Sequence, residues 1–219
     1  MSAEYNHGPV RVVTENSQFR VQDEVLSARA FADLQRLLAQ AAFEKVHQPG
    51  RGYAWRPEDG EPEATTPCFH DGPEPWAATL FEMLLRPEAS RPLVDTGWKT
   101  VSARAFRHSA GSGLSWHTDD PSYAGAWIYF AHPAWDCHWG GELLVADPSC
   151  RGSQWRQSGE ASRQAETALV GEVGVGSWIF PKPNRLVVIA AGHMHRVNPV
   201  TAGAGGHART TVSGFFLRA

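Results

Sequence analysis

Two side chains that could bind a metal ion lie two positions apart in the segment SGLSWHTDDPSYAGAWIYF, which covers residues 112–130. They are His117 and Asp119, and a run of strand-forming aromatic residues follows them. On a β-strand, residues i and i+2 point to the same face, so the imidazole and the carboxylate would lie side by side. Two ligands hold a metal ion poorly, and such a pair often arises by chance. A third ligand is therefore expected from elsewhere in the fold.

A second segment could supply that ligand. In RLVVIAAGHMHRVNPV, residues 185–200, a strongly apolar strand runs out into His193 and His195. Two neutral histidines and one carboxylate on one face of an octahedron are the ligand set of non-haem Fe(II) oxygenases, and they leave three positions open. Zinc accepts the same ligands. The residues alone thus predict an iron or zinc site and leave the choice between the two histidines open.

An arginine stands at the start of the last strand-like segment, ARTTVSGFFLRA, residues 208–219. Alternation places Arg209 on the same face as Thr211, Ser213 and Phe215. A buried guanidinium is costly unless a carboxylate neutralises it, and its planar fork suits recognition of a carboxylate through two hydrogen bonds. We expect Arg209, helped by the Ser213 hydroxyl, to bind the far carboxylate of a dicarboxylate whose 2-oxo acid end chelates the metal.

The elements that must position these residues are mainly short strands. Before residue 98 the sequence predicts a strand in FRVQDEVL, a helix that begins after the candidate N-cap Ser27, and a second helix over Trp76–Arg86. The strands expected after it lie at residues 100–106, 126–130, 141–146, 177–180, 185–191 and 208–217. Gln48–Pro75 is expected to be a long loop, and Asp147–Gly176 a mobile insertion or a long hairpin connection. Short strands in series favour a sandwich or barrel with two helices packed on one sheet.

Composition limits the classes of partner and location. The chain has 219 residues, enough for one sizeable domain, and no linker divides it. A net charge of −3 with scattered Lys and Arg disfavours nucleic acid and anionic membrane surfaces as partners. No apolar run could span a bilayer, and the first residues lack the features of a signal peptide. Three widely spaced cysteines, Cys68, Cys137 and Cys150, disfavour a disulfide framework and favour the cytoplasm. The oligomeric state stays open.

Taken together, the motifs resemble those of the 2-oxoglutarate- and Fe(II)-dependent dioxygenases, specifically the prolyl-hydroxylase-like branch. The resemblance covers Thr100 to Phe216. RAFRHSAGSGLSWHTDD is similar to the family's strand, glycine turn and metal-binding His-x-Asp pair, and IYFAHPAWDCHWGGELLV to its tyrosine-bearing strand and Gly-Gly-Glu-Leu hairpin. FPKPNRLVVIAAGHMHRVNPV and ARTTVSGFF are similar to the strands that carry the distal histidine and the arginine. Four motifs in the same order make the resemblance specific.

The resemblance implies an α+β, mainly β fold. Residues 98–219 would form a double-stranded β-helix, also called a jelly roll and cupin-like, and residues 1–97 would supply supporting helices and loops. The whole chain, residues 1–219, would be a single dioxygenase domain. Iron would lie near the mouth of one end of the jelly roll.

The resemblance also implies a set of site residues. His117, Asp119 and His195 would ligate Fe(II), because the family's histidine precedes a pattern that stands here as RVNP. His193 is the rival for the third position. Arg209 would bind 2-oxoglutarate. Many relatives carry a cosubstrate-binding tyrosine where this chain has Phe130, so we expect the neighbouring Tyr129 or Ser213 to supply the missing hydroxyl. The candidates for the substrate pocket are His108, Trp116, Tyr123, Trp127 and Trp139.

The activity implied by the resemblance is oxidation of a substrate by O2, with conversion of 2-oxoglutarate to succinate and CO2. We expect hydroxylation of an unactivated C–H bond in an amino-acid side chain, within a peptide or protein or in a small amino-acid-derived metabolite. Related halogenases have a small residue at the position of Asp119, so its carboxylate favours hydroxylation. Two alternatives stay open: a zinc-dependent hydrolase with the same His/Asp/His set, which would leave Arg209 unexplained, and a non-catalytic jelly-roll binding protein.

Overall fold

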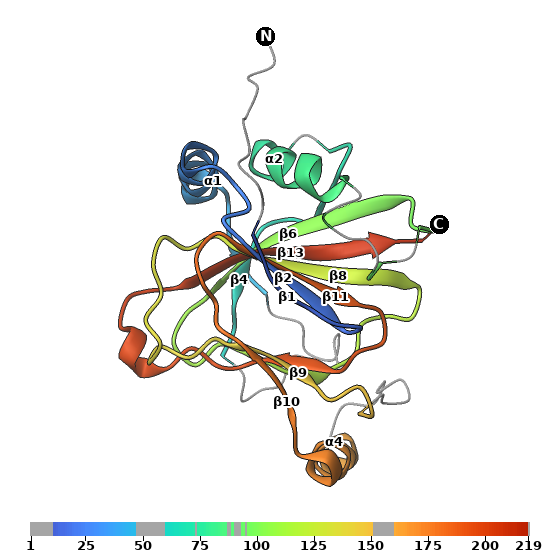
Figure 1. Cartoon of the computed structure of the whole chain (residues 1–219). Helices are drawn as coiled ribbons and strands as arrows, with labels where there is room; N and C mark the ends of the chain where they lie inside the picture. Colours follow the sequence, from blue (N-terminus) through green and yellow to red (C-terminus); the bar gives the residue numbers. More distant parts are fainter. Residues whose placement is uncertain are drawn as a thin grey trace.

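Two antiparallel β-sheets face each other and make up most of the protein (Figure 1). The computed structural model describes residues 11–46, 60–72, 74–86, 89, 93–94, 96–150 and 160–218. In spatial order the larger sheet contains β1 (Arg11–Glu15), β2 (Phe19–Asp23), β11 (Arg185–Ala190), β8 (Tyr123–Phe130), β13 (Arg209–Leu217), β6 (Thr100–His108), β4 (Glu63–Ala64) and β3 (Glu44–Lys45), and β5 (Cys68–Phe69) also pairs with β6. The smaller sheet contains β10 (Gly176–Ile179), β9 (Leu143–Ala146), β12 (His195–Val197) and β7 (Leu114–His117).

The inner faces of the two sheets enclose an apolar core. Alternating residues of β8 and β11 meet alternating residues of β9 and β12 there, as period-two side-chain alternation requires. The buried members of this core are Phe19, Val21, Phe130, Leu143, Val145, Ile179, Val187, Ile189 and Val197. This arrangement of two packed sheets confirms the predicted jelly-roll architecture.

Two helices cover the outer face of the larger sheet. They are α1 (Ala28–Gln40) and α2 (Pro75–Leu84), and both lie above that sheet in Figure 1. The predicted N-cap is confirmed, because the Ser27 side chain accepts a hydrogen bond from the Ala30 backbone N–H at 3.2 Å. Leucines spaced at helical intervals are fully buried against the sheet, and each contributes about 2 kcal/mol of hydrophobic stabilisation.

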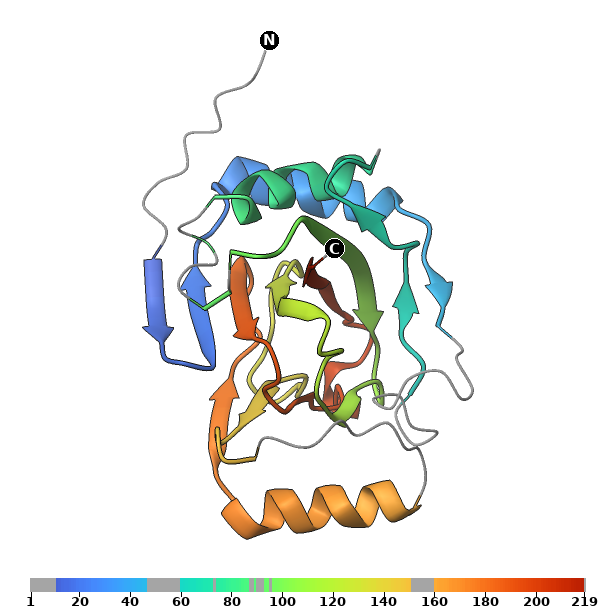
Figure 2. The ribbon, with the colours of Figure 1, turned by 90° about the vertical axis from the view of Figure 1, so that its right-hand side faces the viewer.

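The segment Asp147–Gly176 joins β9 to β10, which pair antiparallel, so it is the long hairpin connection that was one of the two expectations. Its described part also contains a third helix, α4 (Glu160–Val173), which was not predicted. Its last turns pack Leu169 and Val170 near Trp116 and Met194, and Figure 2 shows the helix on the far side of the smaller sheet from α1 and α2. An amphipathic segment of this kind becomes a stable helix once its apolar side chains have a surface to cover.

The strand predicted in FRVQDEVL is confirmed as β2, and the described residues before position 98 contain four further strands. Strands β1 to β5 belong to this region, and β1 to β4 extend the larger sheet. The second half of the predicted loop Gln48–Pro75 therefore contains the short strands β4 and β5, while its residues 48–59 lie outside the described residues. In the described part of the chain, none of the helices has the length and apolar character needed to cross a membrane. Cys68, Cys137 and Cys150 are all free thiols.

Candidate metal and cosubstrate site

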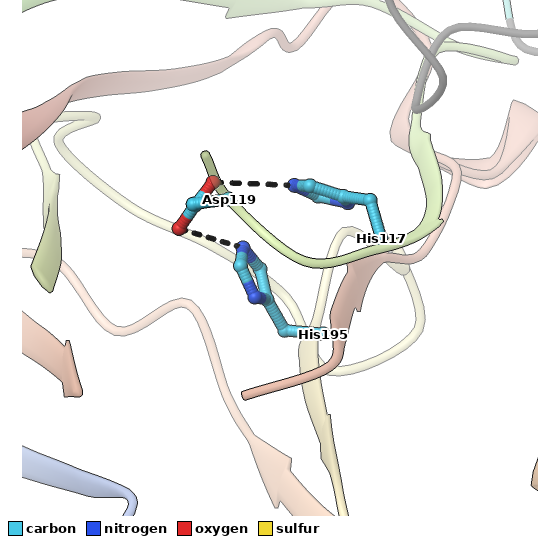
Figure 3. A group of neighbouring side chains, drawn as sticks. All are labelled: His117, Asp119 and His195. Carbon is cyan, nitrogen blue, oxygen red and sulfur yellow. Dashed lines mark ion pairs between the residues drawn. The ribbon is translucent and has the colours of Figure 1, made fainter. Parts of the chain in front are cut away.

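Two histidines meet where the edge strand β7 pairs with β12. His117 ends β7 and lies opposite His195 in the register of the two strands. Their ring centroids are 4.2 Å apart. Asp119 lies two residues beyond the end of β7, so the expectation that it shares a strand face with His117 is wrong. Its carboxylate reaches the two rings from the turn that follows the strand (Figure 3).

The three side chains leave space for an ion between them. Asp119 Oδ1 is 3.9 Å from His117 Nε2, and Asp119 Oδ2 is 3.8 Å from His195 Nε2. Both distances are too long for direct hydrogen bonds. One ligand atom from each residue lies within 4.8 Å of the others. Because metal–nitrogen bonds are about 2.1 Å long, a cation at the centre could contact all three.

The hydrogen bonds of the two histidines select the nitrogen that can bind a metal. His117 Nδ1 lies 2.8 Å from the Ser115 carbonyl, and His195 Nδ1 lies 3.0 Å from the His193 carbonyl. Since a carbonyl only accepts, each Nδ1 must carry the proton, which leaves the Nε2 lone pair directed at Asp119. Burial, together with the neighbouring His195, lowers the pKa of His117 to about 4 against the opposing effects of Asp119 and Ser115. The donor set fits Fe(II).

The other candidate ligands lie elsewhere. His193 is buried, and its Nδ1 lies 3.3 Å from the Gln18 side-chain amide, while its carbonyl accepts the hydrogen bond from His195. The fold therefore brings His195, rather than His193, to His117 and Asp119. A second group of possible ligands, formed by residues 136–138, is exposed, and its carboxylate already accepts a hydrogen bond from a backbone N–H two residues later.

Arg209 is a buried cation whose hydrogen-bond partners in the described residues are neutral. It begins β13, opposite His108 of β6, and is 2% exposed. Its Nη1 donates to the Gly141 carbonyl at 2.7 Å, and its Nη2 lies 3.3 Å from His108 Nδ1. Among the residues that the structure describes, no carboxylate pairs with it, and its buried Nε has no hydrogen-bond partner. Burial lowers the pKa of Arg209 to about 9 although Glu142 opposes the shift.

Glycine is required next to this arginine. Gly141 has a φ of +75°, a left-handed conformation that other residues adopt at a cost. A Cβ atom there would lie 3.0 Å from Arg209 Cδ. The Gly-Gly pair of the hairpin thus lets the backbone approach the guanidinium and place a carbonyl against it.

One cavity joins the three metal-ligand candidates to Arg209. It holds about 560 Å³ of space between atoms, part of which is open to solvent. The residues that line it are Phe106, His108, Leu114, His117, Asp119, Ala126, Trp127, Ile128, His195, Val197, Arg209, Thr211, Ser213, Gly214 and Phe215. Of the predicted pocket residues, His108 and Trp127 are in this set. Phe106 and Leu114 were missed, although the alternation of β6 would have placed Phe106 on the face of His108.

The three other aromatic candidates do not line this cavity. Trp116 packs toward α4, on the outer face of the smaller sheet. Tyr123 contacts Phe215 with the rings tilted and their centroids 4.3 Å apart, and Trp139 stacks on His207 at the same separation. Phe215 itself faces the cavity, so Tyr123 can influence the site through it.

The structure does not bring Tyr129 into the site. Its hydroxyl donates to Asn184 Oδ1 at 2.7 Å, and its ring contacts Phe31 of α1 edge-on. Residues 128 and 130 point inward, so strand alternation turns Tyr129 toward the helices. The expected role for its hydroxyl is therefore corrected.

The position of Ser213 also needs correction. It lines the cavity, but it lies four residues from Arg209 on β13, about 13 Å along the strand at about 3.3 Å per residue. Thr211 lies between them on the same face and is 2% exposed. Its hydroxyl has no hydrogen bond within the described part of the chain. Thr211 is thus the hydroxyl beside Arg209.

Comparison with known proteins identifies the family. Residues 103–217 match the model of the 2OG-Fe(II) oxygenase superfamily, where 2OG denotes 2-oxoglutarate. No curated protein matches the chain. A prolyl-4-hydroxylase from Pseudomonas putida shares 16% identity with a TM-score of 0.61, and the match covers 92% of this chain and 93% of that one. EctD from S. alaskensis shares 17% identity with a TM-score of 0.61, over 92% and 73% of the two chains.

A further structure holds ligands. HygX from Streptomyces hygroscopicus, crystallised with nickel, 2-oxoglutarate and hygromycin B, shares 11% identity with a TM-score of 0.59, over 92% of this chain and 83% of that one. At these identities the structural likeness shows the fold, a double-stranded β-helix. The match of more than half the chain to one family model shows the family. This protein belongs to the 2OG-Fe(II) oxygenase superfamily and is a 2-oxoglutarate-dependent dioxygenase that uses Fe(II) and O2.

Proposed function

We propose that the enzyme hydroxylates an unactivated C–H bond of an amino-acid side chain, in a peptide or protein or in a small amino-acid-derived metabolite. One molecule each of substrate, 2-oxoglutarate and O2 would give the hydroxylated product, succinate and CO2. The observation that carries this proposal is a buried guanidinium to which no described residue offers a carboxylate, in the same cavity as three converging candidate metal ligands. A buried cation of this kind is costly unless an anion binds to it.

In this proposal His117 and His195, each through Nε2, and Asp119 hold Fe(II). Bound Fe(II) supplies the activation of O2 that oxidises 2-oxoglutarate and the substrate. The backbone carbonyls that accept from the two Nδ1–H groups keep both rings in the orientation that metal binding requires. Because Asp119 occupies a ligand position that is vacant in halogenases, its carboxylate favours hydroxylation.

Arg209 and Thr211 are proposed to bind the far carboxylate of 2-oxoglutarate. The hydrogen bond from Arg209 Nη1 to Gly141 fixes the guanidinium before the cosubstrate arrives, and Nε remains available as a donor. The Thr211 hydroxyl can add one more bond. Apolar walls from Phe106, Leu114 and Ile128 exclude water from this end of the cavity, which strengthens the charge pairing.

Two broader predictions belong to this proposal. Residues 1–219 are proposed to form one domain, because strands from residues 11–64 extend the sheet that carries Arg209. A cytoplasmic location remains a prediction, which three free thiols fit.

Turnover assays test the proposed function. Purified protein is incubated with Fe(II), 2-oxoglutarate and air, and succinate is measured by NMR with and without a mixture of cell metabolites and peptides. Mass spectrometry then identifies the component that gains one oxygen atom. We expect succinate from the wild type and none from Asp119→Ala. Absence of succinate from the wild type under air, or a substrate hydrolysed instead of oxidised, would contradict the proposal.

A further inference from the structure

A second arginine shares the inner face of the larger sheet with Arg209. Arg104 lies on β6, two and four residues before Phe106 and His108, which both line the cavity. Residues at this spacing on a strand point to the same face. Its partner across to β13 is Ser213, which also lines the cavity. Arg104 is not itself among the lining residues, but it is next to two of them, Phe106 on its own strand and Ser213 across on β13.

The fold holds the guanidinium of Arg104 in place. Its Nε donates to the Thr65 carbonyl at 2.7 Å, and its central carbon lies 5.4 Å from the centre of the Phe106 ring. Thr65 is itself fixed to β6, since its backbone N–H donates to the Ala105 carbonyl at 3.0 Å and its hydroxyl accepts from the Ala105 N–H at 3.2 Å. An arginine anchored through one nitrogen loses little further conformational entropy when its other nitrogens bind a ligand.

Arg104 has no acidic partner in the described residues. Arg185 pairs with Asp23 at 2.6 Å, and Arg20 pairs with Glu15 at 2.7 Å, whereas no carboxylate pairs with Arg104. Its pKa is lowered by burial alone, with no acid to oppose the shift. Its two terminal nitrogens make no hydrogen bond to any described residue. They are therefore available to bind an anion.

The two cations mark opposite ends of one row of residues. In the register of β6 and β13, Arg209 lies opposite His108 and Ser213 lies opposite Arg104. Arg104 precedes His108 by four residues, which is about 13 Å at about 3.3 Å per residue. The metal-ligand candidates line the same cavity. If Arg209 takes the cosubstrate, as the proposed function requires, then Arg104 is the cation left for the substrate.

We infer that Arg104 and Ser213 bind a carboxylate of the substrate, which makes the substrate a small amino-acid-derived acid. One guanidinium beside one hydroxyl matches a planar, singly charged carboxylate. The Phe106 and Phe215 rings on the same face can hold the apolar part of such a molecule. This inference rests on the proposed function, since it needs Arg209 to be occupied by 2-oxoglutarate.

Paired probes test the inference. N-acetyl amino acids and their carboxamides are titrated by calorimetry into the protein. The protein is first loaded with 2-oxoglutarate and with Zn(II) in place of Fe(II), so that no turnover occurs. We expect at least one acid to bind the wild type about 10- to 100-fold more tightly than its carboxamide, the usual effect of charged hydrogen bonds. Arg104→Gln should remove this preference, and Arg104→Lys, which keeps the charge, should retain part of it.

Arg107→Gln is a matched control. Arg107 lies on the same strand with its guanidinium 3.8 Å from the centre of the Phe43 ring, and its Nη2 donates to the Leu38 carbonyl at 3.0 Å. It has the same kind of anchorage on the opposite face, so its loss should leave the preference for acids unchanged. Thermal melting of the three variants then separates a binding effect from a change in folding.

Three outcomes would overturn the inference. They are an unchanged preference in Arg104→Gln, an equal loss in Arg107→Gln, and a wild type that binds no acid in preference to its carboxamide. Succinate formation with Fe(II) in air is measured in parallel. Its absence from the wild type would refute the proposed function, whereas normal succinate formation with an unchanged acid preference in Arg104→Gln would refute only the role of Arg104.

Discussion

Replacing Arg209 with methionine is expected to stabilise the protein without 2-oxoglutarate and to abolish the stabilisation that 2-oxoglutarate provides. The reason is that the wild type buries a guanidinium for which no described residue supplies a counter-ion. Methionine has a similar length and no charge, so it fills the same space without the desolvation cost.

The magnitude follows from the lowered pKa. A fall from 12.5 to about 9 corresponds to an upper limit of about 5 kcal/mol for burying the charge, at about 1.4 kcal/mol per pKa unit. The substitution also removes the hydrogen bond to the Gly141 carbonyl, which costs about 1–3 kcal/mol. The unfolding free energy of the metal-free, ligand-free variant should therefore rise, by at most about 2–4 kcal/mol.

Urea denaturation measures both effects. For the wild type with Zn(II) and 2-oxoglutarate at 100 times its Kd, the unfolding free energy should rise by about 2.7 kcal/mol. For Arg209→Met, a loss of affinity of about 100-fold or more should reduce this gain to about 0.4 kcal/mol or less. With 2-oxoglutarate, the difference in unfolding free energy between Arg209→Met and the wild type should therefore shrink or change sign.

Arg185→Met is the control for this experiment. Arg185 is also largely buried, but its Nε and Nη2 donate to Asp23 at 2.6 and 3.1 Å. Its loss should destabilise the protein by about 3 kcal/mol and leave the effect of 2-oxoglutarate intact. If Arg209→Met destabilised the ligand-free protein as much as Arg185→Met and kept the full response to 2-oxoglutarate, the role assigned to Arg209 would be refuted.

Three further results are expected. His195→Ala should weaken Zn(II) binding by about 100-fold or more while His193→Ala retains most of it, because only His195 faces the other ligands; equilibrium dialysis giving the reverse order would exchange their roles. Tyr129→Phe should lower the unfolding free energy by about 1 kcal/mol without changing the concentration of 2-oxoglutarate that turnover requires. A higher required concentration would show that the Tyr129 hydroxyl binds the cosubstrate. Burial favours a higher pKa for Asp23, but hydrogen bonds from Arg185 and Lys182 outweigh this effect and lower the pKa. The Asp23 carboxylate therefore stabilises the protein fully above pH 3.8, and this contribution is lost as the pH falls through the folded-state pKa. The stability difference between wild type and Asp23→Asn should shrink under acid titration, and a constant difference would rule out this linkage.

Strand alternation explains why part of the site could be predicted. The residue types around Arg209 alternate, so its face and its need for an anion followed from the sequence. The same rule places Tyr129 out of phase with the cavity, where the structure shows its hydroxyl bonded to Asn184. The alternation also places Thr211 nearer than Ser213 to Arg209. This could have been predicted, because Thr211 is two residues and Ser213 four residues from Arg209 in the sequence.

Other features depend on the tertiary structure. The position of Asp119 depends on the turn after β7, in which Asp120 accepts hydrogen bonds from the backbone N–H and the hydroxyl of Ser122, and a rule for strands does not apply there. Helix α4 lies in a polar segment whose few apolar residues needed the smaller sheet as a partner. That none of the described acids lies beside Arg104 could be seen only once the fold had placed its neighbours.

Anomalous diffraction from crystals grown anaerobically with Fe(II) and 2-oxoglutarate tests the central claim most directly. The predicted result is one iron peak about 2.0–2.2 Å from Nε2 of His117, Nε2 of His195 and a carboxylate oxygen of Asp119, the range for such ligand atoms. The far carboxylate of 2-oxoglutarate should then contact Arg209. An iron peak at His193 or at residues 136–138, or a dicarboxylate bound away from Arg209, would contradict the account.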